Sequence, residues 1–118
     1  MRRRLAPLLL LLLLLCALGG DTPAHHLSVT VTAYCTGSVT AAGTRPRVGI
    51  VALSRDVERR MWLELSDTVR LQGMGVYTFE DRMPFYWQRR VDVYMSSCPD
   101  ARQFGTRVMR LERHFFPL

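Results

Sequence analysis

The sequence contains no lysine, so all 16 of its basic residues are arginines. It has only three histidines and three cysteines, and none of them follows the spacing of a zinc site, so we expect no metal. No glycine-rich phosphate-binding pattern opens an expected helix, which argues against a nucleotide cofactor. A long apolar run is also lacking. Residues 8–18 are continuously apolar, but 11 residues are too few to cross a hydrocarbon core of roughly 30 Å.

The length of 118 residues fits one domain, and the hydrophobic fraction of 48% is that of a globular chain rather than a disordered one. The leucine is unevenly distributed, because much of it lies in the run near the N-terminus. The whole sequence is therefore not expected to be the folded protein.

The N-terminal residues have the pattern of a secretory signal peptide: Arg2 to Arg4, then the short apolar run, then small residues. Ala17 and Gly19 are suitable small residues for cleavage after position 19. The expected organisation is a signal peptide at 1–19, a linker at 20–26 and one domain at 27–118. A lipid anchor on Cys16 is the alternative, but the residue before a lipidated cysteine should be small, and here it is Leu15.

Cleavage would leave 99 residues with 13 arginines and 10 acidic residues, a net charge of +3. This charge is too mild to indicate a nucleic-acid partner. Two cysteines would remain, Cys35 and Cys98, an even pair for an oxidising compartment. A bridge between them would stabilise the domain by roughly 4 kcal/mol in the chain-entropy model. The alternatives are two separate buried thiols, or Cys35 as a nucleophile with His114 as its base.

Short apolar or β-branched runs separated by turn residues predict six strands and two short helices. The linker histidines, His25 and His26, are expected in solvent. Helical turns are expected at 55–61, with Ser54 as N-cap, and again from Pro99 to a left-handed Gly105. The strands are expected at 27–34, 48–53, 67–71, 76–80, 91–95 and 108–111. Six short strands in so small a chain predict an all-β fold, a small six-stranded barrel, with residues 115–118 packed across it.

Two aspartates are the candidate acid–base residues. In the strand at 91–95, Asp92 lies on the opposite face from the apolar residues, so it should face solvent or a groove. Asp81 closes the preceding strand, on the face of Tyr77 and Phe79. A carboxyl group against aromatic rings can have a raised pKa, which suits a general acid. The alternative is that these aspartates are surface carboxylates paired with nearby arginines.

Three aromatic residues, Phe85, Tyr86 and Trp87, lie between these aspartates in the sequence. They fit a platform on which sugar rings stack, but they also fit the packed cap of a hairpin. Because aromatic side chains dominate core burial, the residues alone favour packing.

The order of several short motifs resembles the three-aspartate (3D) domain family. The first are Val31-Thr32-Ala33-Tyr34-Cys35 and Thr40-Ala41-Ala42-Gly43-Thr44, followed by Val48-Gly49 and Val51-Ala52. The later ones are Gly73-Met74-Gly75-Val76-Tyr77, Glu80-Asp81, Arg90-Val91-Asp92-Val93-Tyr94 and Phe104-Gly105. The resemblance covers roughly residues 28–111, and the 11-residue step from Asp81 to Asp92 equals the family's separation.

The resemblance implies a double-psi β-barrel similar to the barrel of membrane-bound lytic transglycosylase A and of rare lipoprotein A-like proteins. Active members cleave peptidoglycan between N-acetylmuramic acid and N-acetylglucosamine and give a 1,6-anhydro sugar. By this resemblance Asp92 is the acid, Asp81 is the second aspartate, and Tyr34 and Thr40 line the groove. The aromatic stretch 85–87 would then help to position the sugars.

The chain departs from the family pattern at two places. Ser54 stands where the family has its first aspartate, and Asp56 is two positions late. Arg82 follows Asp81 where the family has open space, and a pairing of Arg82 with Asp81 or Asp92 would hold that carboxylate ionised.

The sequence thus predicts a protein exported to the periplasm or envelope of a bacterium, with peptidoglycan glycan strands as its partner. The expected activity is cleavage of lytic transglycosylase type. The alternatives are a non-catalytic peptidoglycan-binding or envelope-assembly module, and a structural envelope domain that binds proteins.

Overall fold

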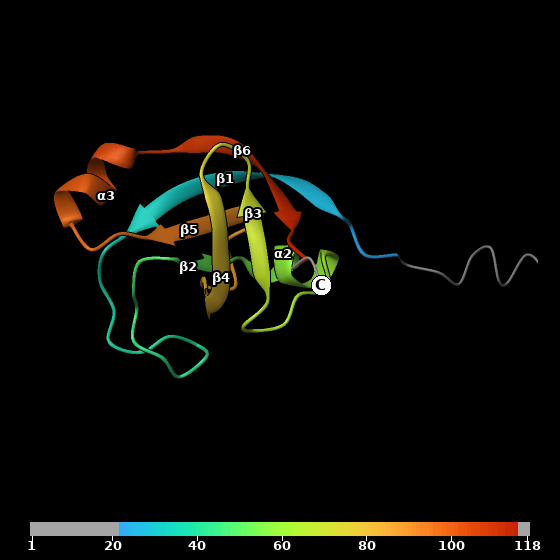
Figure 1. Cartoon of the computed structure of the whole chain (residues 1–118), viewed down its shortest axis with the longest axis horizontal. Coiled ribbons are helices and arrows are strands. Elements are labelled where there is room, and N and C mark those ends of the chain that lie inside the picture. The colour runs from blue at the N-terminus through green and yellow to red at the C-terminus, as the bar shows by residue number, and fades with distance from the viewer. Residues whose placement is uncertain (1–21, 116–118) are drawn as a thin grey trace, which may run out of the picture.

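The computed structural model describes residues 22–115, which form a closed barrel in the strand order β1-β5-β2-β4-β3-β6 (Figure 1). Two short helices, α2 (Arg55–Arg60) and α3 (Cys98–Phe104), complete the fold. The all-β class and the small six-stranded barrel are therefore confirmed. The strands are β1 (His26–Tyr34), β2 (Ile50–Leu53), β3 (Thr68–Leu71), β4 (Gly75–Arg82), β5 (Arg90–Tyr94) and β6 (Arg107–Arg113).

Every predicted strand is present, and the errors are at the ends. The second strand begins at Ile50 instead of residue 48, because Gly49 has a φ of 102° and Val48 before it is exposed. The fourth strand runs two residues beyond its predicted end, to Arg82, so Asp81 lies within a strand and not at its terminus.

The barrel consists of two halves with the same order of elements. The first half is β1, β2, α2 and β3, and the second is β4, β5, α3 and β6. Exchanging the halves reproduces the pairings: β1 with β5 and β4 with β2 are parallel, whereas β1 with β6 and β4 with β3 are antiparallel. Parallel pairs inside so small a closed barrel are compatible with a double-psi arrangement.

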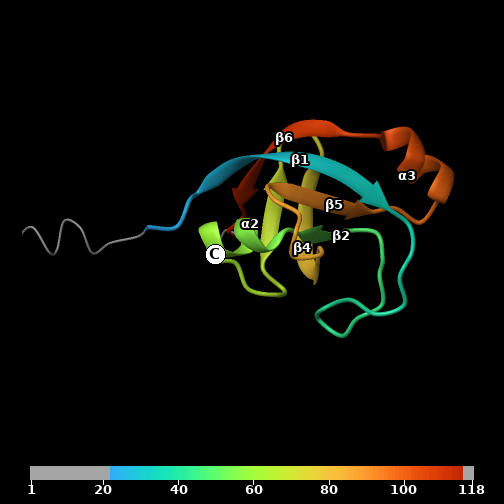
Figure 2. The same ribbon diagram turned by 180° about the vertical axis from the view of Figure 1, so that it is seen from behind.

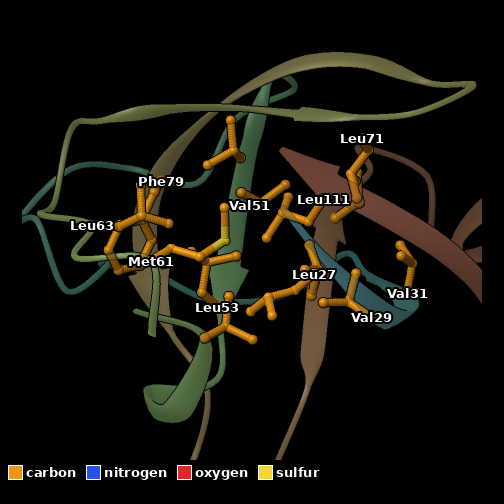
Figure 3. Close-up of a cluster of buried hydrophobic side chains, with 14 of the residues drawn as sticks. Leu27, Val29, Val31, Val51, Leu53, Met61, Leu63, Leu71, Phe79 and Leu111 are labelled. Carbon is orange, nitrogen blue, oxygen red and sulfur yellow. The ribbon is translucent and has the colours of Figure 1, made fainter. Parts of the chain in front are cut away.

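The barrel interior is filled by aliphatic side chains from five strands and by Phe79 of β4, the largest wholly buried side chain (Figure 3). In β5 the interior residues are Val91 and Val93, so the residues between them face outward, as the alternation predicted. Met61 and Leu63 close the core beside α2.

The two helices begin at serines that serve different purposes. Ser97 caps α3 as its hydroxyl accepts a hydrogen bond from Asp100 N at 3.3 Å. Ser54 occupies the N-cap position of α2, but its side chain caps nothing there, which corrects the predicted capping role. Gly105 ends α3 with a φ of 68° and a ψ of −135°, which is a positive φ but not the predicted left-handed helical conformation.

A disulfide joins Cys35, directly after β1, to Cys98, the first residue of α3, with 5.1 Å between their Cα atoms. This confirms the predicted bridge and excludes Cys35 as a free nucleophile. His25 and His26 are exposed, as predicted. Phe115 is exposed, so the prediction that the C-terminal stretch packs across the barrel is wrong for this residue, and residues 116–118 lie outside the described part.

The predicted signal peptide and Cys16 also lie outside the described residues. Within residues 22–115, no helix is long and apolar enough to cross a membrane. The end of the described chain at Thr22 and helix α3 lie at opposite ends of the barrel (Figures 1 and 2).

Candidate functional site

A β-bulge in β4 determines the position of Asp81. Val51 pairs with Phe79, but the next residue of β2, Ala52, pairs with Asp81, so Glu80 is the extra residue. The strand alternation had placed Asp81 on the face of Phe79. That prediction is wrong, because the extra residue moves Asp81 off the interior face occupied by Phe79.

The bulge aligns four residues across four neighbouring strands. Thr32 of β1 pairs with Asp92 of β5, Asp92 pairs with Ala52 of β2, and Ala52 pairs with Asp81 of β4. Asp92 faces outward between two interior valines, so these four residues lie on the outer surface of the barrel. They are called the aspartate row below. The two candidate carboxylates, 11 residues apart in sequence, are thus separated by one small side chain.

Asp92 is partly buried and accepts a hydrogen bond from the Thr32 hydroxyl at 3.1 Å. Burial raises the pKa of Asp92 above the ordinary value for an aspartate. The Thr32 hydrogen bond and the Arg90 charge oppose this effect, while the negative charge of Asp81 adds to it. The raised pKa is the property that sequence reasoning required of a general acid, but its main cause is burial and not contact with aromatic rings.

Asp81 accepts two backbone hydrogen bonds through the same carboxylate oxygen. The donors are Arg82 N at 2.9 Å and Ala41 N, in the loop between β1 and β2, at 3.1 Å. These two bonds fix the position of the Asp81 side chain beside Asp92.

Tyr34 lies close to both aspartates. Burial raises the pKa of its hydroxyl strongly, and the negative charges of Asp81 and Asp92 raise it further. The hydroxyl oxygen is buried without a well-formed hydrogen bond to any described residue. Its ring meets Tyr94 edge to face at a centroid distance of 5.4 Å. The structure thus brings Tyr34 together with Asp81 and Asp92.

Hollows lie on either side of this tyrosine pair. One, of about 250 Å³, is lined by Tyr94, Tyr77 and Asp100 among others, and the second, of about 350 Å³, by Tyr34, the disulfide and Arg102. Neither of these two hollows is lined by Asp81 or Asp92.

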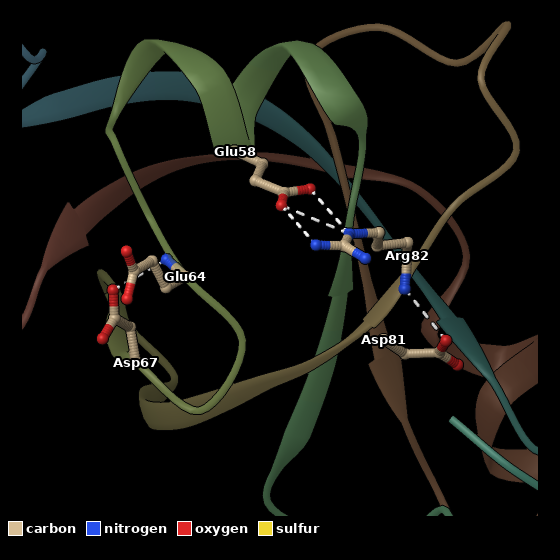
Figure 4. A network of polar contacts seen from close by, with 5 residues as sticks. All are labelled: Glu58, Glu64, Asp67, Asp81 and Arg82. Carbon is tan, nitrogen blue, oxygen red and sulfur yellow. Dashed lines mark hydrogen bonds and ion pairs between the residues drawn. The ribbon is translucent and has the colours of Figure 1, made fainter. Parts of the chain in front are cut away.

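Arg82 does not pair with either candidate carboxylate. Its guanidinium forms a bidentate ion pair with Glu58 of α2, with Nη2–Oε1 at 2.7 Å and Nε–Oε2 at 3.0 Å. Figure 4 shows the Arg82 side chain directed at Glu58, while only its backbone nitrogen meets Asp81. The expectation that Arg82 holds an aspartate ionised through its charge is therefore wrong, since Glu58 neutralises that charge.

Ser54 and Asp56 hold the beginning of β5. The buried Ser54 hydroxyl accepts a hydrogen bond from Arg90 N at 2.9 Å, and the Asp56 carboxylate accepts one from Arg89 N at 2.9 Å. Burial opposes ionisation of Asp56, but hydrogen bonds with Ser54 and with backbone N–H groups outweigh it and lower its pKa. Arg89 has a φ of 50°, which is unusual for a side-chain-bearing residue, so these bonds fix a strained entry to the strand that carries Asp92.

From the sequence, Ser54 was predicted only to cap a helix and to stand where the 3D-domain family has an aspartate. The available signal was that two hydrogen-bonding side chains, Ser54 and Asp56, follow the second strand within three residues.

The aromatic residues of the β4–β5 loop are exposed, Phe85 by 84% and Tyr86 by 65%. The favoured prediction of a packed cap is therefore wrong for these two rings. They contact each other edge to face, and Tyr86 contacts Trp87. Trp87 carries the Arg90 guanidinium 4.0 Å from its ring centroid, and the same Arg90 charge acts on Asp92. The loop thus adjoins the aspartate row through Arg90.

Thr40 is buried, and its hydroxyl lies 2.7 Å from that of Thr44 within its own loop. It shapes the turn whose next residue, Ala41, donates to Asp81. Two further contacts attach this loop to β4: Ala42 N donates to Glu80 O at 2.9 Å, and Arg47 forms an ion pair with Glu80 at 2.6 Å. Thr40 therefore acts on Asp81 indirectly, through the turn that contains Ala41. It is buried and does not lie on the open surface beside Asp92.

Across residues 22–115 there is no group of three histidine, cysteine, aspartate or glutamate side chains that could hold a metal ion.

The comparisons with known proteins found no match: no family model matches the chain, and no curated protein is significantly similar to it.

Proposed function

We propose that the protein is an exported peptidoglycan-acting enzyme of the 3D-domain type, which cleaves glycan strands in the manner of a lytic transglycosylase. The observation that carries the proposal is the row Thr32–Asp92–Ala52–Asp81, in which two carboxyl groups flank one small residue on an outward face. The disulfide supports export, because such bridges persist in oxidising compartments.

Asp92 is the proposed acid and base. Its raised pKa keeps a larger fraction of the carboxyl group protonated, so it can donate a proton to the glycosidic oxygen as the bond from C1 of the muramic acid residue breaks. The resulting carboxylate then takes the proton from the C6 hydroxyl of the same sugar. That oxygen bonds to C1 and closes the 1,6-anhydro ring, so no water is consumed, unlike in a two-carboxylate hydrolase.

Asp81 is the proposed electrostatic partner. Two backbone N–H groups hold its carboxyl group in place, where a negative charge would stabilise the positive charge that develops on the sugar ring. Tyr34 and the aromatic loop 85–87 would contact neighbouring sugar rings. Thr40 contributes through the loop that holds Asp81.

A direct test incubates the mature protein with purified sacculi and measures 1,6-anhydro muropeptides by mass spectrometry. We expect them to form, and Asp92→Asn to reduce them about 100-fold or more. Glu64→Gln, a change at an exposed carboxyl group outside the row, is the matched control and should leave the yield unchanged. Equal product from Asp92→Asn and the parent would refute Asp92 as the acid.

The second candidate is a non-catalytic module that binds peptidoglycan. Ser54 favours it, because this residue replaces the family's first aspartate and its hydroxyl is committed to Arg90 N. Co-sedimentation with sacculi without any anhydro product would select this candidate over the enzyme.

A further inference from the structure

The groove with the largest volume among those described lies beside α2, away from the aspartate row. It measures about 500 Å³. One side is formed by Thr22, Pro23 and Ala24, and the other by Arg59, Arg60 and Trp62, with Leu27 also contributing. Ala24 N donates a hydrogen bond to Arg60 O at 2.8 Å, so the two sides are attached to each other. This set of residues is called the Trp62 groove below.

Trp62 is held outward by a strained and well-anchored turn. It is 57% exposed although both neighbours, Met61 and Leu63, are buried in the core. Its φ is 49°, a conformation that costs energy for a residue with a side chain. The Arg113 guanidinium of β6 donates to the carbonyl oxygens of Met61 and Trp62 and thereby fixes the turn. Trp62 thus places a large apolar ring at the surface, next to Pro23, Ala24 and Leu27 of the same groove.

The rim of the groove is cationic. Arg59 and Arg60 are exposed and have no acidic partner among the described residues, and Arg55 is exposed one turn earlier on the helix. The acidic residues of the same helix are occupied elsewhere, since Glu58 pairs with Arg82 and Asp56 accepts from Arg89 N. The exposed side of α2 therefore has a positive charge that is complementary to an anionic surface.

The position of the groove favours a membrane surface over a glycan. Pro23, Ala24 and Leu27 offer no side-chain hydrogen bonds to sugar hydroxyls. Tryptophan and arginine together suit a lipid headgroup layer, where the ring lies at the interface and the guanidinium meets phosphate. The first described residue, Thr22, lines the groove itself.

We propose that the Trp62 groove docks the protein on an anionic phospholipid surface, with Arg59 and Arg60 binding lipid phosphates and Trp62 entering the headgroup layer. The aspartate row, on the outer face of β5, β2 and β4, is a separate site. A protein docked in this way keeps its N-terminal end toward the membrane and α3, at the opposite end, away from it (Figure 1).

Fluorescence tests the proposal because the chain has only two tryptophans. In a Trp87→Phe background, Trp62 is the only one. Vesicles that contain phosphatidylglycerol should shift its emission to the blue, and brominated acyl chains should quench it. Vesicles of phosphatidylcholine alone should do neither. No response to the anionic vesicles, or an equal response to both kinds, would overturn the proposal.

Charge-reversal variants locate the surface. Arg59→Glu with Arg60→Glu should weaken vesicle binding at least tenfold. Arg45→Glu with Arg102→Glu, at exposed positions in the β1–β2 loop and in α3, changes the net charge equally and should retain most of the binding. Equal loss in both pairs would show a net-charge effect and overturn the assignment to the groove.

Glycerol phosphate without vesicles must leave the Trp62 emission unchanged, because a full response to it would mean a site for a soluble anion. Unchanged circular dichroism establishes that each variant is folded.

Discussion

The half of the barrel that contains β1 to β3 and the half that contains β4 to β6 have the same element order and equivalent pairings. Their outward residues differ. At the position where β2 and β5 meet, the first half contributes Ala52 and the second contributes Asp92. The second half also supplies Asp81 and the aromatic loop, whereas the first half supplies Thr32, Ser54 and Asp56, which hold Asp92 or its strand.

Topology alone therefore does not determine where the candidate reacting groups lie. One half carries the candidate reacting groups and the other positions them, although both are built in the same way.

The disulfide ties the first half, at Cys35, to the second, at Cys98. Replacing both cysteines by serine should lower the free energy of unfolding by about 4 kcal/mol, because the unfolded chain is no longer constrained. Urea denaturation of the oxidised parent and the double variant measures this difference. A loss close to zero would mean that the bridge does not join the halves in the folded protein.

The two serines before the helices give a matched pair. Ser54→Ala leaves the Arg90 N–H at the start of β5 without its partner, and we expect a loss of 1–3 kcal/mol, about 2 at the centre of that range. Ser97→Ala removes an ordinary N-cap contact and should cost about 1 kcal/mol. Denaturant titration of both variants compares them. A smaller loss for Ser54→Ala than for Ser97→Ala would contradict the positioning role of Ser54.

A variant of Arg82 distinguishes its ion pair with Glu58 from an electrostatic effect on the two aspartates. Arg82→Met should cost at most about 1 kcal/mol of stability, and a double-mutant cycle with Glu58→Gln should account for it. The yield of anhydro muropeptides should stay within about twofold of the parent, since the Arg82 backbone contact to Asp81 remains. A rise of tenfold or more would show that the Arg82 charge does suppress the acid.

The smallest expected effect is the pH dependence of stability caused by Asp92. A carboxyl group with a raised pKa binds its proton more tightly in the folded state than in the unfolded state. Its contribution to stability therefore falls as the pH rises from the unfolded value of about 3.9 through the folded pKa. Asp92→Asn should unfold at a slightly higher temperature than the parent at about pH 7, with no such gain at about pH 3. Melting curves of both proteins at both pH values check this. If Asp92→Asn melts at a lower temperature than the parent at about pH 7, the ionised Asp92 does not carry a burial cost.

The fold was largely predictable, because six alternating segments, two helix signals and an even cysteine pair are local features of the chain. The candidate site was only partly so. The two-residue alternation identified the outward face of Asp92, but the bulge at Glu80 inverts that alternation for Asp81 and leaves no mark in composition. The partner of Arg82, Glu58, is 24 residues upstream and meets it only when α2 packs on the barrel. Likewise the Ser54 hydroxyl bonds a strand that begins 36 residues later.

The central claim is that the barrel holds Asp92 as an acid, with a pKa raised by burial and further by the charge of Asp81. Carboxyl-detected NMR titration of Asp92, in the parent and in Asp81→Asn, tests it most directly. We expect a pKa above the ordinary value of about 3.9 in the parent and a lower one when the Asp81 charge is removed. A pKa at or below that ordinary value in the parent would contradict the account.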